Sequence, residues 1–261
     1  MIKNVLKGKK ILITGASSGI GKACALALAE YGVHLLLVAR RIRRLQQLQQ
    51  EIIQKHHIDV AIYETDISNR SQVTALADDL RAKKITPDIL INNAGLASGL
   101  SKIQDGNFDD WDKMIDTNLK GLLAITRLLL PHMIERNTGH IINIGSIAGH
   151  QVYPNGNVYN ATKFAVRALT EAMNIDLVDT NIRVSSIDPG AVETEFSQVR
   201  FHGDKERAAK VYEGYIPLSA EDIADAVTYV LTRPPHVNIR EMLVLPTAQR
   251  SATVIGRTHT K

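Results

Sequence analysis

Short apolar runs alternate along the chain with longer segments in which apolar residues recur at helical spacing. The runs are almost continuously apolar and four to seven residues long, which is typical of strands buried on both faces of a sheet. We predict seven strands, at residues 11–14, 33–39, 60–65, 89–92, 140–146, 183–188 and 242–245.

The segments between these runs have the period of amphipathic helices. Alternating strands and helices are typical of a parallel sheet with helices on both faces and right-handed crossovers. No linker or repeat divides the chain, so we predict one Rossmann-type, doubly wound α/β domain over residues 1–261. The helices are expected to begin near Gly19, Ile42, Ser71, Phe108, Val158 and Ala220, the last of them capped by Ser219.

One segment, residues 189–218, departs from this alternation. It is too long for an ordinary connection and contains no strand pattern. We interpret it as an irregular lid that covers a substrate.

The composition indicates the cellular compartment and the classes of binding partner to expect. The 31 Lys and Arg residues against 27 Asp and Glu give a net charge of +4 that is spread along the chain, so nucleic acid is not a favoured partner. The single cysteine, Cys24, lies in a helical apolar pattern and is expected to be an inert buried thiol. No run approaches the roughly 18 apolar residues of a membrane span, and the N-terminus lacks a signal-like apolar stretch. We expect a cytoplasmic protein.

A glycine-containing turn joins the first strand to the first helix. It reads Gly15-Ala16-Ser17-Ser18-Gly19-Ile20-Gly21. Glycine allows a sharp turn and a close approach to a pyrophosphate, and the amides of the following helix stabilise negative charge. The alternative is a tight turn without a ligand, but the strand before it and the helix after it favour dinucleotide binding.

The end of the second strand indicates which dinucleotide is bound. A site for NAD usually places an acidic side chain there, whereas arginine accommodates the 2′-phosphate of NADP. This chain reads Ala39-Arg40-Arg41, which predicts NADP(H). The alternative is a solvated basic loop, because Arg43 and Arg44 follow at once.

A second group of residues is suited to proton transfer. Tyr159 and Lys163 are four apart on a predicted helix, so they share one face, and the ammonium is expected to lower the pKa of the phenol. Such a pair alone is common on helix surfaces. Ser146, however, ends a strand at the carboxyl edge of the sheet, where its hydroxyl can bond a substrate oxygen. Asn118, in a long helix over 108–136, is either an exposed polar residue or a ligand for a water molecule.

Together these residues make the chain similar to the short-chain dehydrogenase/reductase family over nearly its whole length. The resemblance implies a catalytic set of Asn118, Ser146, Tyr159 and Lys163, and no metal. Its motifs are Thr14 to Gly21, Asp66, Asn92-Asn93-Ala94-Gly95, Asn118, Ser146, Tyr159-x-x-x-Lys163 and Pro189-Gly190 followed by Thr194. The implied NADP(H) contacts are Gly15, Ser17, Ser18, Gly19, Ile20, Gly21, Arg40, Arg41, Asp66, Ile67, Asn93, Ala94, Gly95, Tyr159, Lys163, Pro189, Gly190, Val192 and Thr194.

Residues 193–203 and 233–239 also resemble the NADP-dependent 3-hydroxy acid dehydrogenases, although the chain departs from their pattern after Ile239. This implies an NADP(H)-dependent oxidoreductase for a small 3-hydroxy acid or a similar secondary alcohol. The expected substrate contacts are Ser146, Tyr153, Tyr159 and Arg200, with Arg200 either binding a carboxylate or only pairing with a neighbouring acid.

Two alternatives remain at this point. One is a reductase of 3-oxoacyl thioesters or bulky ketones in the same family, and the other is a dinucleotide-sensing protein without turnover. The resemblance further implies a homo-oligomer, a tetramer or a dimer, that packs through the helices at 108–136 and 158–179.

Overall fold

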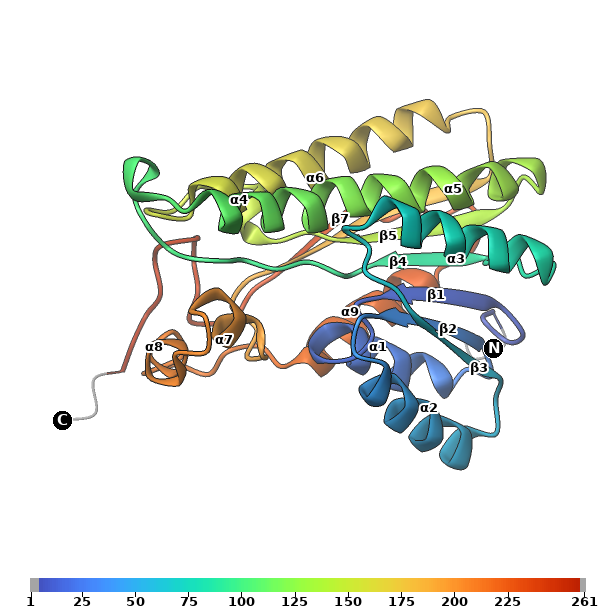
Figure 1. Ribbon diagram of the computed structural model, residues 1–261, viewed down its shortest axis with the longest axis horizontal. Helices are drawn as coiled ribbons and strands as arrows, with labels where there is room; N and C mark the ends of the chain where they lie inside the picture. Colours follow the sequence, from blue (N-terminus) through green and yellow to red (C-terminus); the bar gives the residue numbers. More distant parts are fainter. Residues whose placement is uncertain (1–4, 259–261) are drawn as a thin grey trace.

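The computed structural model describes residues 5–258, so the first four and last three residues of the predicted domain lie outside the described residues. Within that range the strands form one parallel sheet of seven, in the order β3-β2-β1-β4-β5-β6-β7 (Figure 1). This confirms the predicted doubly wound sheet. The strands are β1 (Lys10–Thr14), β2 (His34–Ala39), β3 (Val60–Glu64), β4 (Ile89–Asn92), β5 (Gly139–Ile144), β6 (Ile182–Pro189) and β7 (Glu241–Val244).

Helices cover both faces of the sheet (Figure 1). One layer consists of α1 (Gly19–Ala29), α2 (Ile42–His56) and α9 (Ala220–Leu231), the last begun by a Ser219 capping box as predicted. The other consists of α3 (Arg70–Ala82), α4 (Phe108–Ile115), α5 (Leu122–Glu135) and α6 (Asn157–Asp176).

The strand pattern explains this layering. Successive side chains on a strand point to opposite faces. On β1, Ile11 and Ile13 therefore join the core beneath α1, α2 and α9, whereas Leu12 joins the core beneath α3 and α5. Both cores need apolar residues at every strand position, which is why the runs in the sequence are continuous rather than alternating.

The helix expected over residues 108–136 is interrupted. Between α4 and α5 the chain forms a π-helical segment, η3 (Asp116–Gly121), which contains Asn118. A π-helical turn holds an extra residue and is common at functional sites. The interruption turns Asn118 inward, where it is buried.

The segment 189–218 is more ordered than the sequence suggests. It contains two short helices, α7 (Phe196–Arg200) and α8 (Lys205–Lys210), and an isolated parallel bridge joins Val192 to Leu218. The bridge brings the two ends of the segment together, so residues 193–217 form a loop that leaves the sheet and returns to the same place. We call this loop the lid.

Two further expectations concern the single cysteine and membrane-spanning helices. Cys24 is buried in α1, and burial raises the pKa of its thiol to about 12, so the thiolate is disfavoured as predicted. Among residues 5–258, none of the helices combines the length and apolar character that crossing a bilayer requires.

His140 predicts acid-sensitive stability. It is buried in β5, where its Nε2 bonds the hydroxyl of Ser185, and burial lowers the pKa of its imidazole from 6.5 to about 3. The unfolded chain therefore binds this proton below pH 6.5 while the folded chain does not, and the free energy of unfolding should fall by up to about 1.4 kcal/mol per pH unit. In urea titrations from pH 7 to 4, His140→Leu should flatten this slope. The exposed His236→Gln should not, and an unchanged slope in His140→Leu would contradict the assignment.

Candidate active site

A cavity of about 310 Å³ opens at the carboxyl edge of the sheet, beside β1, where the strand order reverses. Ligands of open parallel sheets bind at such reversal points. The cavity brings together most of the residues singled out from the sequence: Gly15, Ser17, Ser18, Gly19, Ile20, Arg40, Arg41, Asp66, Ile67, Asn93, Ala94, Gly95, Ser146, Tyr159, Lys163, Pro189, Gly190, Val192 and Thr194.

Four predicted site residues do not line this cavity. Gly21 and Asn118 lie behind its wall, whereas Tyr153 and Arg200 line a smaller cavity that adjoins it at Tyr159. The large cavity also contains residues to which the sequence analysis gave no role, among them Leu96, Thr117, Gly145, Glu195 and Phe196.

The glycine turn is fixed by steric constraints and by hydrogen bonds from the neighbouring strand. Gly15 and Gly19 have φ angles of +67° and +51°, which favour glycine. A Cβ on Gly21 would lie 2.5 Å from the Asn93 amide nitrogen. That nitrogen donates to the carbonyl oxygens of Thr14 (2.9 Å) and Gly15 (3.3 Å), so Asn93 holds the turn in place.

The basic residues after β2 face this turn. The Arg41 guanidinium donates to the hydroxyls of Ser17 (3.2 Å) and Ser18 (2.6 Å). It also donates to Glu195 of the lid at 2.8 Å, and Arg44 donates to the other oxygen of the same carboxylate at 2.6 Å. The alternative of a merely solvated basic loop therefore does not fit Arg41, because this side chain connects the turn to the lid.

Tyr159, Lys163 and Ser146 converge on the cavity from two elements. Tyr159 and Lys163 lie one turn apart on α6, and the ammonium is 6.0 Å from the phenol ring centroid and donates to the Ile144 carbonyl at 2.8 Å. Ser146 follows β5 and accepts a hydrogen bond from the Ala148 amide at 3.1 Å. The Tyr-x-x-x-Lys pair is thus buried at the carboxyl edge of the sheet rather than exposed on a helix surface.

Asn118 is buried, and its side chain makes three hydrogen bonds. Its amide donates to the Leu96 carbonyl (2.8 Å) and to the Thr162 hydroxyl (3.1 Å), and its Oδ1 accepts from the Leu96 amide (2.8 Å). It therefore joins the π-helical segment to α6 and to the chain after β4. Of the two alternatives that the sequence left open, exposure is wrong.

Burial controls the ionisation of the two central groups. It raises the pKa of Tyr159 above its usual range, and the neighbouring Arg200 and Ser146 only partly oppose this effect. It lowers the pKa of Lys163 to about 8, partly opposed by Asp188. The expected lowering of the tyrosine pKa by the ammonium is not what this structure shows, because desolvation outweighs it and the ammonium is bonded to a carbonyl. In this structure the neutral phenol is favoured.

Arg200, at the end of α7, extends over the aromatic wall of the site. Its Nη2 donates to the Tyr153 hydroxyl at 2.7 Å, and its guanidinium carbon lies 5.0 Å from the Tyr159 ring centroid. Its Nε is buried without a partner, and no carboxylate within residues 5–258 lies within ion-pair distance of the guanidinium. Pairing with a neighbouring acid is thus not observed, and this partly buried cation can bind an anionic group.

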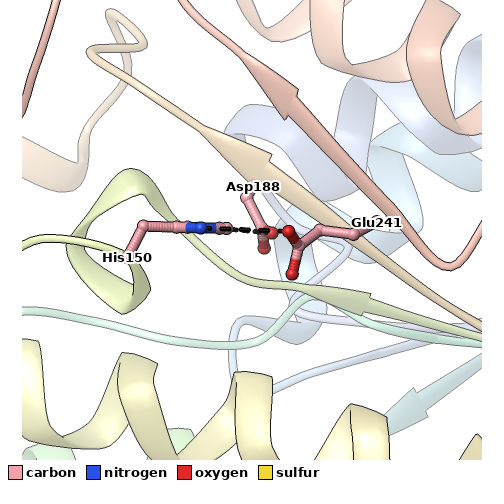
Figure 2. A group of neighbouring side chains, drawn as sticks. All are labelled: His150, Asp188 and Glu241. Atoms are coloured by element: carbon pink, nitrogen blue, oxygen red, sulfur yellow. Dashed lines mark hydrogen bonds and ion pairs between the residues drawn. The ribbon is translucent and has the colours of Figure 1, made fainter.

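Three ionisable residues, His150, Asp188 and Glu241, lie close together (Figure 2). His150 Nε2 bonds Asp188 at 2.8 Å, and its Nδ1 faces Glu241 at 3.9 Å. Arg167 donates to the other oxygen of Glu241 at 2.8 Å. Each ring nitrogen thus faces a different carboxylate, and the two nitrogens do not point to one shared metal position. The side chains form a row of polar contacts that attaches the turn after Ser146 to β6 and β7.

Comparisons with known proteins agree with this geometry. Residues 9–205 match the model of the family described as short chain dehydrogenase. A relative from Schizosaccharomyces pombe, an NADP-dependent 3-hydroxy acid dehydrogenase, is 44% identical over 97% of this chain and 98% of its own length. Its counterpart from Escherichia coli K12 is 43% identical over 93% and 96%. A closed serine dehydrogenase complexed with NADP+ superposes with a TM-score of 0.88 at 41% identity, covering 96% of this chain and 100% of that one.

Gly145 offers a test of how tightly the site is packed. A Cβ there would overlap the Asp188 carboxylate and lie 2.9 Å from the Ser186 hydroxyl, and all three groups belong to neighbouring strand ends. Gly145→Ala should therefore lower the free energy of unfolding by about 1–3 kcal/mol, as overpacking does elsewhere. Gly256→Ala is the matched control, because its nearest neighbour would be 3.7 Å away. Equal stability of the two variants in chemical denaturation would contradict this account.

Proposed function

The chain belongs to the short-chain dehydrogenase family, and we propose on that basis that it transfers hydride between NADP(H) and a small 3-hydroxy acid or its carbonyl form. The observation that carries the proposal is the convergence of Tyr159, Lys163 and Ser146 on the cavity at the glycine turn. The NADP-dependent relatives support the cofactor, and the partly buried Arg200, whose Nε has no partner, supports an acidic substrate.

The residues present fit NADP(H). The positive φ angles of Gly15 and Gly19 leave the turn open to a pyrophosphate, and the end of β2 carries Arg40 and Arg41 but no acid. Bound there, the cofactor supplies or accepts the hydride. We assign the 2′-phosphate to Arg40 and Arg41, the adenosine to Asp66, Ile67, Asn93, Ala94 and Gly95, the nicotinamide ribose to Tyr159 and Lys163, and the nicotinamide to Pro189, Gly190, Val192 and Thr194.

In the reducing direction Tyr159 donates its proton to the substrate oxygen, and the Ser146 hydroxyl bonds the same oxygen as charge develops on it. The raised tyrosine pKa suits this direction, because the neutral phenol is the proton donor. Oxidation requires the phenolate, which burial disfavours in this structure and which a nearby Lys163 ammonium would favour by its charge. Asn118 is a positioning residue in this scheme, since it holds the chain after β4 against α6.

Two observations separate this function from the alternatives. A thioester or bulky ketone has no carboxylate two carbons from the reacting carbon, so it would leave the partly buried Arg200 cation unpaired. A sensor without turnover would have no use for Tyr159, Ser146 and Lys163 gathered at one cavity.

We further propose a cytoplasmic homo-oligomer, a tetramer or a dimer, built from single-domain subunits. Apolar side chains remain exposed on α5 and α6, as expected of helices that pack against a second copy. They are Leu123, Ile134, Phe164 and Ile175.

Replacing Tyr159 by Phe removes the proton donor and keeps the ring. NADPH should still bind, with the loss of at most one ribose contact, because the ring still packs against Phe196 at a centroid distance of 5.6 Å. Turnover should fall by at least about 100-fold, the usual size of a general acid–base contribution. NADPH fluorescence titration and steady-state rates with 3-hydroxy acids and semialdehydes measure the two quantities. A turnover close to that of the wild type would overturn the role given to Tyr159.

Arg200→Gln tests the substrate class. Losing a partly buried cation that pairs with a carboxylate should lower kcat/KM for a 3-hydroxy acid by about 100-fold or more. The kcat/KM for a neutral secondary alcohol should change much less. Arg207→Gln is the control, because this second lid arginine lies over Phe201, 4.6 Å from the ring centroid, and lines neither cavity. Equal losses for acid and alcohol would favour the alternative substrates.

A further inference from the structure

Glu195 connects the lid to the basic residues after β2. It is the N-cap residue of α7, more than 150 positions from the arginines in sequence, and its two oxygens accept from Arg41 (2.8 Å) and Arg44 (2.6 Å). Arg41 is held against the glycine turn by Ser17 and Ser18 at the same time. The carboxylate is therefore a lid group in the part of the cavity that also contains Arg40 and Arg41.

The chemistry of this contact resembles that of a bound phosphate. Two guanidinium groups that share the oxygens of one anion form the arrangement that arginine makes with phosphate. The same contacts keep Glu195 ionised, since the hydrogen bond from Arg41 lowers the pKa of the carboxyl group. Unlike a structural ion pair, this one is open to solvent, because the Arg41 and Glu195 side chains are 44% and 41% exposed.

The ion pairs of Glu195 with Arg41 and Arg44 are weak enough for another anion to replace the carboxylate. Solvent-exposed ion pairs contribute little net stability. A phosphate monoester carries nearly twice the charge of a carboxylate and offers three acceptor oxygens. A 2′-phosphate that reaches Arg41 is therefore the stronger ligand for it, and the repulsion between two anions disfavours keeping both at the same guanidinium.

We propose that Glu195 weakens the preference for NADP(H) over NAD(H) by competing with the 2′-phosphate of NADP(H) for Arg41, a role that rests on the proposed function. Glu195 occupies the arginines when no phosphate is present and is displaced when NADP(H) binds. NAD(H) lacks the phosphate and leaves the pair in place. The carboxylate thus lowers the affinity for NADP(H) without affecting that for NAD(H).

The competition also involves the substrate side of the lid. Phe196, next to Glu195, packs on the Tyr159 ring, and α7 ends at Arg200 over the same ring. Displacing Glu195 releases the N-terminal end of this short helix from the arginines. The freedom of the lid above the catalytic tyrosine therefore depends on whether the bound dinucleotide carries a 2′-phosphate.

Equilibrium binding tests the proposal without turnover. Isothermal titration calorimetry should compare the wild type, Glu195→Gln and the control Glu206→Gln, which removes an exposed lid charge that makes no ion pair among residues 5–258. The ligands are NADP+, NAD+ and adenosine 2′,5′-bisphosphate, whose lack of nicotinamide limits its contacts to the adenosine side.

Glu195→Gln should bind NADP+ and the bisphosphate roughly twofold to tenfold more tightly, since a competing anion is removed. The affinity for NAD+ should stay within about twofold, and Glu206→Gln should match the wild type. An unchanged or weaker NADP+ affinity in Glu195→Gln would overturn the proposal. A wild type that prefers NAD+ would instead overturn the cofactor assignment, so the two failures are distinguishable.

Discussion

The site depends on the reversal of strand order at β1. The first three strands progress outward from β1 to β3, and β4 returns to the other side of β1. The chain after β1 and the chain after β4 therefore lead to helices on opposite faces of the sheet. Backbone from both loops then meets at one point, where Asn93 bonds the glycine turn and Thr14 accepts from the amides of Asn93 and Ala94 at 3.0 Å. A side chain at Gly15 would collide with this junction, which explains the residue types on both loops.

Burial shifts the pKa values of three groups at the site, and it also makes their charged forms costly to hold. The structure places an ammonium, a phenol and a carboxylate in a region of low polarity, and each has a shifted pKa for that reason. Hydrogen bonds offset part of the cost: Lys163 donates to a strand carbonyl, and Asp188 is bonded by Ser186 and His150. Glu241, which is drawn in Figure 2, also accepts a hydrogen bond from Arg167, an exposed residue that extends this compensation outward.

The sequence predicted the features that depend on local pattern. The strands, the glycine turn and the Tyr159–Lys163 spacing follow from periodicity and residue type, and the structure reproduces them. The sequence did not reveal the π-helical turn at Asn118, because one extra residue in a helix leaves the apolar pattern nearly intact. The Glu195–Arg41 pair could not be predicted from the sequence, because it joins segments that are far apart along the chain. The raised pKa of Tyr159 could not be predicted either, because desolvation depends on the completed packing.

The lid helix α7 has contacts with both halves of the site, which its length explains. A five-residue helix spans about 7.5 Å. Glu195 at its start contacts the arginines beside the glycine turn, while Arg200 at its end lies against Tyr153 and Tyr159. An element this short has no interior of its own to resist motion, so its position follows from the groups bound at its ends. A change at the arginines beside the glycine turn and a change at the aromatic wall can therefore both move the same helix.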